Sequence, residues 1–368
     1  MSLRPVLLAA LLVVAGLAAG PPAAAQETGQ SCSFPVTRTD ATDTAVTVES
    51  APERVVALGP SAAQTMWDIG GRDQVVGMPV NAYTSYLEGY DERTNVMNPD
   101  GYTVNVERVV NLTPDLVLAP NIVRDDTVGK LRAAGLTVYK FRFAADIGDV
   151  KAKTRLTGRL TGNCAGAAER VDWMEERLAT IREAVADEPR PRVIYPLGGG
   201  IVAGKGTFLH EVIRTAGGSN VAAAANITGY GRASPEVIVA RNPQWLILNE
   251  GLPRSAIQMG AYNHTIAGRE EQFVRVNPNY ANQPAPRVVL AIETIAKTLH
   301  PDAYAAANAT ASPTPTPPPD EPRTPTATAT APPTPSSTPT EAPGQPGFGV
   351  VAALVALGGL AFLRRAAR

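Results

Sequence analysis

The side chains that could hold a metal ion are few and scattered in this sequence. It contains three histidines, His210, His264 and His300, and two cysteines, Cys32 and Cys164. A zinc or manganese site needs several histidine and carboxylate ligands that converge on one point. His210 falls inside one expected helix and His300 near the end of another, away from the loops of the first half of the chain. We therefore expect no metal site and no cofactor.

Two catalytic patterns can be weighed in the same way. Gly199 through Lys205 match the spacing of a phosphate-binding loop, but Gly206 stands where a serine or threonine must hold magnesium. No Ser-His-Asp or Cys-His arrangement falls in a recognisable nucleophile turn. Nucleotide binding is therefore not expected, and a hydrolase is kept only as an alternative of a different class.

Tyrosines and side-chain amides gather instead in loops that follow or adjoin expected strands. Aromatic rings with polar tips provide flat contact area and a hydrogen bond at modest entropic cost, which suits a large amphipathic ligand. Each residue could equally be an ordinary half-buried one, so the prediction depends on the set. The candidate ligand-binding residues are Tyr83, Tyr86, Asn98, Tyr102, Tyr230, Tyr280 and Asn282.

A strongly anionic ligand would require arginines that lie close together. Four arginines fall in or near loops, but their spacing in the sequence does not bring them together, and solvated surface positions are the default interpretation. They are Arg124, Arg142, Arg232 and Arg254.

The elements that must position these loops occur twice in the chain. A short helix is expected over 106–110, followed by a strand over 116–118, and the same pattern recurs over 235–239 and 245–248. Glu107 or Glu236 opens the helix of each copy, and a proline seven positions later cannot continue the helix and forces extended chain. The two halves therefore predict two similar β-α-β-α lobes.

Residues 146–188 separate the two copies and predict a long helix. Val171, Met174, Leu178, Ile181 and Val185 form one apolar stripe at helical spacing. Because short apolar strands alternate with helices, the expected fold class is α/β, with two Rossmann-like lobes that carry parallel sheets. A long rigid helix joins the lobes, and the ligand cleft lies between them. The N-terminal lobe is assigned to residues 52–145 and the C-terminal lobe to 189–305.

Both ends of the chain predict export and anchoring. Residues 1–25 combine an early arginine, an apolar run and small residues before a cleavage site, as in a signal peptide. Residues 26–51 are an N-terminal arm, and 306–345 form a Pro/Thr-rich stalk too polar to fold. In 346–368 an apolar run of roughly 22 Å precedes terminal arginines and predicts a membrane-anchor or sorting segment. We expect a cell-surface protein on the outer face of the cytoplasmic membrane.

Charge and cysteine usage agree with an exported protein. The formal net charge of −1 provides no basic surface for nucleic acid. In an exported chain, Cys32 and Cys164 predict a disulfide, with two buried free thiols as the alternative. Candidate glycosylation sequons begin at Asn111, Asn226, Asn263 and Asn308.

Several motifs, in this order and at this spacing, resemble the helical-spine class of ABC transporter substrate-binding proteins. They are Arg54–Leu58, Asn105–Val117, Gly206–Gly218 and Ala285-Pro286-Arg287, and the resemblance covers roughly residues 52–302. The tail from Pro346-Gly347-Phe348 onward resembles the C-terminal sorting signals of archaeal surface proteins. The class carries cobalamin, iron–siderophore complexes and haem.

The resemblance also implies partners. In this class an acidic residue on each lobe docks to arginines of the permease, and these positions fall on Glu107 and Glu236. The alternative is that each glutamate only complements its helix dipole. We expect a monomer that delivers cobalamin or a related corrinoid to an ABC permease and its ATPase subunits. An iron(III)–siderophore or haem carrier of the same class is the first alternative, and an exported surface hydrolase is the second.

Overall fold

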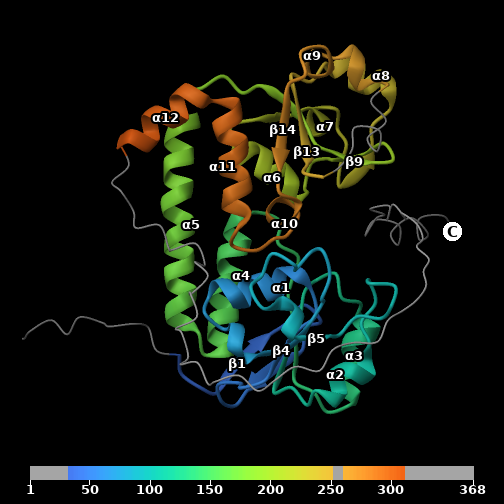
Figure 1. The fold of residues 1–368 in the computed structure, drawn as a ribbon, viewed down its shortest axis with the longest axis vertical. Helices are drawn as coiled ribbons and strands as arrows, with labels where there is room; N and C mark the ends of the chain where they lie inside the picture. The colour runs from blue at the N-terminus through green and yellow to red at the C-terminus, as the bar shows by residue number, and fades with distance from the viewer. Residues whose placement is uncertain (1–31, 252–259, 311–368) are drawn as a thin grey trace, which may run out of the picture.

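The computed structural model describes residues 32–251 and 260–310, which form two α/β lobes beside one long helix (Figure 1). The expected signal peptide and anchor segment, and the stalk beyond residue 310, lie outside the described residues. Within the described ranges, no helix is both long enough and apolar enough to cross a membrane.

The N-terminal lobe contains a five-stranded parallel sheet in the order β5-β4-β3-β6-β7. Every residue of β3, β6 and β7 is buried, which explains the apolar runs in their sequences. Two antiparallel strands from the N-terminal arm pack their valines against the core of this lobe. The elements are β1 (Val36–Thr39), β2 (Ala45–Val48), β3 (Val55–Ala57), α1 (Pro60–Asp68), η1 (Arg72–Gln74), β4 (Val75–Met78), η2 (Tyr90–Glu92), β5 (Thr94–Asn95), α2 (Val106–Asn111), β6 (Leu116–Ala119), α3 (Asp125–Ala133) and β7 (Val138–Lys140).

The C-terminal lobe contains a four-stranded parallel sheet in the order β11-β8-β13-β14. Helices α6 and α11 contribute to its core together with the spine. The elements are β8 (Arg192–Ile194), β9 (Pro196–Gly198), β10 (Ile201–Ala203), α6 (Phe208–Thr215), β11 (Ser219–Asn220), α7 (Val221–Ala224), β12 (Tyr230–Arg232), α8 (Pro235–Arg241), β13 (Trp245–Asn249), η4 (Tyr262–His264), α9 (Ile266–Arg269), β14 (Phe273–Val276), α10 (Pro278–Ala281) and α11 (Val288–Leu299).

This lobe also carries a three-stranded antiparallel sheet, β12-β10-β9, that the sequence analysis did not anticipate. The glycine run 198–200 was interpreted as a lead into a helix. In the structure these glycines have φ values of 94°, 56° and 78°, which L-residues with side chains rarely adopt. They form the tight turn between β9 and β10, so the chain reverses before it reaches α6.

The spine differs from the expected single helix over 146–188. It consists of α4 (Ile147–Thr161) and α5 (Cys164–Val185), which pack against each other. The break falls at Gly162, whose φ of 81° ends α4 in the left-handed region. A β-carbon added at Gly158 would lie 2.4 Å from that of Ala167, so this glycine lets the two helices approach closely.

Helix α5 is the longer of the two, and α4 also reaches both cores, with Ile147 and Val150 in the C-terminal core and Leu160 in the N-terminal core. The 22 residues of α5 extend about 33 Å. Ala167, near its start, belongs to the N-terminal core, whereas Met174 through Val185 contribute to the C-terminal core. Figure 1 shows α5 running along one side of both lobes. Met174, Leu178, Ile181 and Val185 of the predicted apolar stripe therefore form the part of α5 that packs in the C-terminal core.

The C-terminal lobe extends past the expected start of the stalk at residue 306. Helix α12 (Pro301–Thr310) continues to the last described residue before the tail and packs on α5. Tyr304 and Ala307, three positions apart on one face, are buried there. Alanines are strong helix formers, which explains why this alanine-rich segment is helical before the proline-rich sequence begins.

A buried polar network connects the two lobes. The side chain of Gln64 on α1 is fully buried, and its Oε1 accepts a hydrogen bond from the backbone N–H of Arg287 at 2.9 Å. The Arg287 Nε donates to Asp68 Oδ1, also at 2.9 Å. Burial lowers the pKa of Arg287, but the Asp68 carboxylate more than offsets this and holds that pKa above its ordinary value. Arg287 therefore stays charged at neutral pH.

Cys32 and Cys164 form a disulfide, as predicted, with their Cα atoms 5.6 Å apart. The bond joins the start of the described chain to the first residue of α5 across 132 positions. It therefore attaches the N-terminal arm to the helix that both lobes share.

Replacing Arg287 with Gln should lower the free energy of unfolding by about 2–4 kcal/mol, because it removes a cation that contacts a carboxylate only 1% exposed. Urea denaturation measures the loss. The double variant Asp68→Asn/Arg287→Gln should lose less than the sum of the single losses. Arg275→Gln, an exposed position on β14, is the matched control. An Arg287→Gln variant within about 0.5 kcal/mol of the unmodified protein would show that the pair does not stabilise the lobe contact.

The disulfide should contribute about 2–5 kcal/mol to stability, since a long loop is closed in the unfolded chain. Cys32→Ser/Cys164→Ser should lower the denaturation midpoint, and reductant should lower it equally in the unmodified protein. The double variant should not respond to reductant. Two titratable thiols in the untreated protein would contradict the bond.

Candidate functional site

A pocket of about 560 Å³ lies at the carboxyl edge of the N-terminal sheet. It is lined by residues that directly follow three neighbouring strands: Leu58 to Pro60 after β3, Pro79 and Tyr83 after β4, and Ile122 after β6. The carboxyl ends of parallel strands meet at one edge of a sheet, and open α/β sheets bind ligands there. Its lining residues all belong to the N-terminal lobe, whereas the sequence analysis expects the ligand in a cleft between the two lobes.

Apolar and aromatic surface is concentrated at this pocket. Tyr83, Tyr102 and Ile122 line it and are 39%, 66% and 73% exposed. Exposed apolar side chains that gather in a hollow are typical of a binding surface. Burial, and then the neighbouring Tyr102, raises the pKa of Tyr83, so its phenol remains a neutral hydrogen-bond donor at physiological pH.

A tight turn holds Tyr102 against the pocket. Asp100 Oδ1 accepts hydrogen bonds from the backbone N–H groups of Tyr102 and Thr103, both at 2.8 Å. The amide of Asn98 donates to Thr103 Oγ1 at 2.9 Å and does not line the pocket. Asn98, a predicted ligand-binding residue, is thus engaged in shaping the turn that carries Tyr102.

Tyr86 and Tyr280 are engaged with each other between the lobes. Their rings meet edge to face with centroids 5.8 Å apart. The Tyr86 hydroxyl accepts a hydrogen bond from Gln64 Nε2 at 2.6 Å and donates to Gln283 Oε1 at 3.2 Å. Gln283 Nε2 in turn donates to the Tyr83 carbonyl at 2.9 Å. These two tyrosines join the interlobe network, and neither lines the pocket.

The C-terminal lobe contributes a second polar group at its own strand ends. Tyr195 directly follows β8, and its hydroxyl lies 2.5 Å from Asn249 Oδ1, at the end of β13, and 3.0 Å from Asn282 Oδ1. The Asn282 amide donates to Asn249 Oδ1 at 3.3 Å. Burial raises the pKa of Tyr195, and the Tyr230 ring is close enough to add to that rise. Tyr230 is 49% exposed on β12 and could contact a ligand.

Four residues that the sequence analysis did not select contribute to this region: Gln64, Ile122, Tyr195 and Asn249. Tyr195 and Asn249 stand at the ends of expected strands, so the rule that ligands meet strand ends could have found them. Ile122 also follows a strand, but an isoleucine carries no chemical signal. Gln64 lies within an apolar helix, and nothing in the surrounding sequence indicates that it contributes to the site.

The loop arginines do not gather in the pocket. Arg124 lines it and pairs with Asp126 at 3.0 Å. Arg142 pairs with Asp43 at 3.0 Å, and Arg232 donates to the Gly199 carbonyl at 2.7 Å. Arg254 lies outside the described residues. The pocket thus presents aromatic and apolar surface together with Asp126 and two cations, Arg124 and Lys130, of which Arg124 is paired with Asp126.

Metal-ligating side chains do not converge either. Across 32–251 and 260–310, the structure holds no group of three or more His, Cys, Asp or Glu side chains arranged for a metal ion. His210 instead contacts the Asn220 amide through Nδ1 at 3.2 Å. His300 lies against the Gly217 carbonyl at 3.4 Å and is buried.

The two glutamates of the repeat occupy equivalent places. Glu107 is the second residue of α2 and Glu236 the second of α8, and both are exposed. Asn105 and Ser234 cap the two helices through hydrogen bonds to Arg108 N and Val237 N. A hydrogen bond from Ser234 lowers the pKa of Glu236, which keeps it ionised. In Figure 1, α2 and α8 lie on different lobes, on the side away from α5.

The four candidate glycosylation sites are at the surface. Asn111, Asn226, Asn263 and Asn308 are all exposed, so an enzyme could reach each of them. Their modification stays a prediction.

Comparison with known proteins shows which family has this architecture. The family model described as periplasmic binding protein matches residues 55–287. A cobalamin-binding protein of Halobacterium salinarum is 46% identical over 294 residues, which cover 77% of this chain and 79% of that protein.

Two solved structures share the fold. The periplasmic vitamin B12-binding protein of Vibrio cholerae aligns with a TM-score of 0.59 at 23% identity, over 70% of this chain and 98% of that one. The periplasmic heme-binding protein of Roseiflexus sp. RS-1 aligns with a TM-score of 0.61 at 23% identity, over 69% and 99%. The chain therefore belongs to the periplasmic binding protein family, whose members bind a small molecule outside the cytoplasm and present it to an ABC permease.

Proposed function

We propose that this chain captures cobalamin or a related corrinoid and delivers it to an ABC permease and its ATPase subunits. The observation that carries the proposal is the aromatic pocket at the carboxyl edge of the N-terminal sheet, in a chain 46% identical to a protein named for cobalamin binding. Membership in a family of binding proteins also supports this role over the hydrolase alternative.

The chemistry of the two lobes suits a corrinoid. A corrin ring is a broad macrocycle with apolar faces and amide groups around its rim. Tyr83, Tyr102 and Ile122 offer flat and apolar contact on one lobe. Tyr230 and Asn282 offer a ring and an amide on the other. Such a mixture of apolar surface and few oriented polar groups is typical of small-molecule sites.

The arrangement of charge favours a corrinoid over an anionic iron–siderophore complex. Recognition of several carboxylates or phenolates would require arginines with free donors. Arg124 is paired with Asp126, and Arg142 is paired with Asp43 on the N-terminal hairpin. The pocket therefore offers few cations to an anion: Arg124 is shared with Asp126, and Lys130 is the one lining cation that forms no ion pair within the described residues.

Capture would proceed with little movement of the lobes. Helix α5 packs into both cores, and the Gln64–Arg287–Asp68 contacts join the lobes below the cleft. Rigid packing of this kind permits a small rocking motion and opposes wide closure. Glu107 and Glu236 would then dock to arginines on the permease, which spreads the lobes and releases the ligand.

Anchoring completes the proposal. Residues 1–25 would direct export and then be removed. The tail 346–368 would hold the protein at the outer face of the cytoplasmic membrane. The stalk would begin after α12, at residue 311, and act as a semi-rigid spacer. A monomer is enough for this role, because one copy carries both docking glutamates.

Tryptophan fluorescence of the mature chain should report saturable sub-micromolar binding of cyanocobalamin, after correction for its absorbance, and no comparable binding of ferric siderophores or haem. Replacing Tyr83 or Tyr102 with Ala should weaken cobalamin binding about 10-fold each, since each ring supplies about 1–2 kcal/mol of contact.

Val239→Ala is the control for these variants, because Val239 is an exposed apolar residue on α8 that does not line the pocket. Its affinity should be unchanged. Binding of an iron complex in place of cobalamin would overturn the ligand assignment and keep the fold.

Replacing both Glu107 and Glu236 with Ala should abolish uptake of labelled cobalamin in cells and leave its affinity for the purified protein intact. The matched control is Glu49→Ala/Glu188→Ala, which removes two exposed carboxylates elsewhere. Retained uptake in the first variant, or a loss of affinity, would contradict the docking role.

A further inference from the structure

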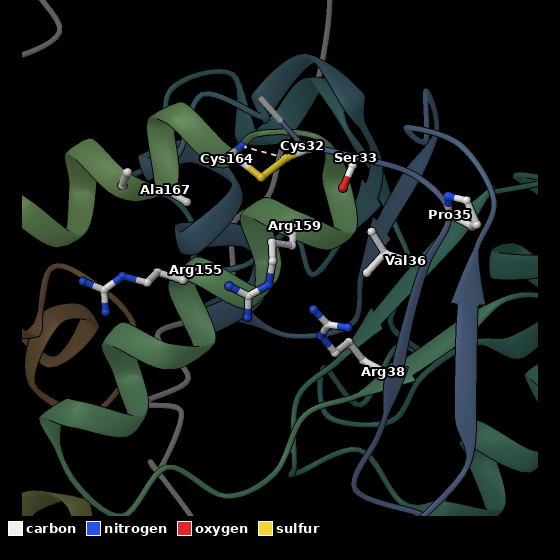
Figure 2. A pocket seen from close by; sticks show the side chains of 10 residues that line it. Cys32, Ser33, Pro35, Val36, Arg38, Arg155, Arg159, Cys164 and Ala167 are labelled. Carbon is white, nitrogen blue, oxygen red and sulfur yellow. Dashed lines mark hydrogen bonds between the residues drawn. A yellow bond between two sulfur atoms is a disulfide. The ribbon is translucent and has the colours of Figure 1, made fainter. Parts of the chain in front are cut away.

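A second pocket lies at the N-terminal end of α5, away from the ligand cleft (Figure 2). Its volume is about 390 Å³, and none of its lining residues belongs to the cleft-side pocket. Strand β1, the last turns of α4 and the disulfide between Cys32 and Cys164 surround it. The disulfide joins the segment that precedes β1 to the first residue of α5, so this part of the wall is held in place.

Arginines are the only ionisable side chains, apart from the bonded cysteines, among the residues that line this second pocket. Arg38 extends from β1, and Arg155 and Arg159 lie one turn apart on α4. Figure 2 shows the guanidinium groups of Arg38 and Arg159 pointing toward one another, with Arg155 at the side. Three cations from two elements thus gather at one hollow.

No carboxylate in the described part of the chain forms an ion pair with any of the three. The Nε of Arg159 is buried and has no hydrogen-bond partner there. Arg38 donates to the neighbouring Thr37 carbonyl at 2.7 Å, which leaves further donors on its guanidinium. Burial, and then the charges of Arg38 and Arg155, lowers the pKa of Arg159.

This arrangement differs from the other arginines near the N-terminal arm. Arg132 pairs with the buried Asp40, and Arg142 pairs with Asp43. A buried donor without a partner and like charges held together both oppose folding. A bound anion would satisfy both at once, and arginine recognises phosphate and sulfate oxygens through paired donors.

We propose that this second pocket binds a soluble multivalent oxyanion, in the form of a phosphate- or sulfate-bearing small molecule. Arg38 and Arg159 hold it between them, and Arg155 adds charge at the edge. The site is separate from ligand capture, so it should be occupied whether or not the cleft holds its ligand.

Inorganic pyrophosphate is the probe, and it is added to the mature chain with its disulfide oxidised. Sodium chloride is adjusted so that the ionic strength stays constant. Thermal unfolding should shift upward by about 5 °C once pyrophosphate is about 100-fold above its dissociation constant. Calorimetric titration should give one site. Arg38→Gln/Arg159→Gln should weaken binding at least about 10-fold and abolish the shift.

Without pyrophosphate, this double variant should unfold at the same temperature as the unmodified protein or at a higher one, because two like charges have been removed. A variant that unfolds earlier both with and without the anion would assign the arginines a packing role and overturn the proposal. Affinity for cobalamin should be unchanged, which separates this test from that of the cleft.

The matched control is Arg241→Gln/Arg275→Gln, which removes two exposed arginines elsewhere and should keep the shift. An equal loss of the shift in the control would mean non-specific screening and overturn the site.

Glu27→Gln tests a carboxylate that stands shortly before Cys32 in the sequence. If pyrophosphate stabilises only that variant, the chain's own carboxylate fills the pocket and no soluble anion is bound. If pyrophosphate shifts the unfolding temperature of neither the unmodified protein nor the Glu27→Gln variant, the proposal is also refuted.

Discussion

The packing of one helix into two hydrophobic cores is the constraint on which the rest of this structure depends. Ala167 of α5 is buried in the N-terminal core, and Met174, Leu178 and Ile181 are buried in the C-terminal core. Because protein interiors are close-packed and deform little, a helix shared in this way fixes the separation of the lobes. The two sheet edges therefore face a cleft of nearly constant width, which suits a ligand of fixed shape and a rigid ring system.

Polar contacts between the lobes also oppose small shifts of one lobe relative to the other. Gln64 is fully buried and accepts from the backbone of Arg287, so a small shift of either lobe would leave buried polar groups without partners. The same contacts hold Tyr86 and Tyr280 edge to face beside the cleft. Spreading of the lobes would strain these contacts, so a partner that separated the lobes would have to supply energy. Glu107 on α2 and Glu236 on α8 are exposed acids at equivalent places on the two lobes.

The two pockets of this molecule offer different kinds of binding surface. The cleft-side pocket presents rings and amides, and the charge of its Arg124 is paired with Asp126. The pocket beside the disulfide presents arginines without carboxylate partners among the described residues. The arginines of the second pocket attract oxyanions, whereas rings attract broad apolar faces, so the two pockets should not compete for one ligand. Of these two pockets the disulfide lines only the second, and its Cys164 begins α5.

The sequence by itself determined the parts of the fold that depend on local pattern. Buried strands such as β3 and β6, the proline-ended helices α2 and α8, and the disulfide partners were predicted because periodicity, proline geometry and cysteine count act over short distances or leave few choices. The place of Tyr83 and Tyr102 beside the pocket followed from strand ends. Only the tertiary structure decided that Tyr86 and Tyr280 contact each other, that Asn98 supports a turn, and that Arg38 meets Arg159. The two tyrosines and the two arginines are far apart in the chain, as are Gln64 and Arg287, which are separated by 223 positions, whereas Asn98 supports its turn through nearby Thr103. The partner of a side chain depends on how whole lobes and helices pack, and no local spacing carries that information.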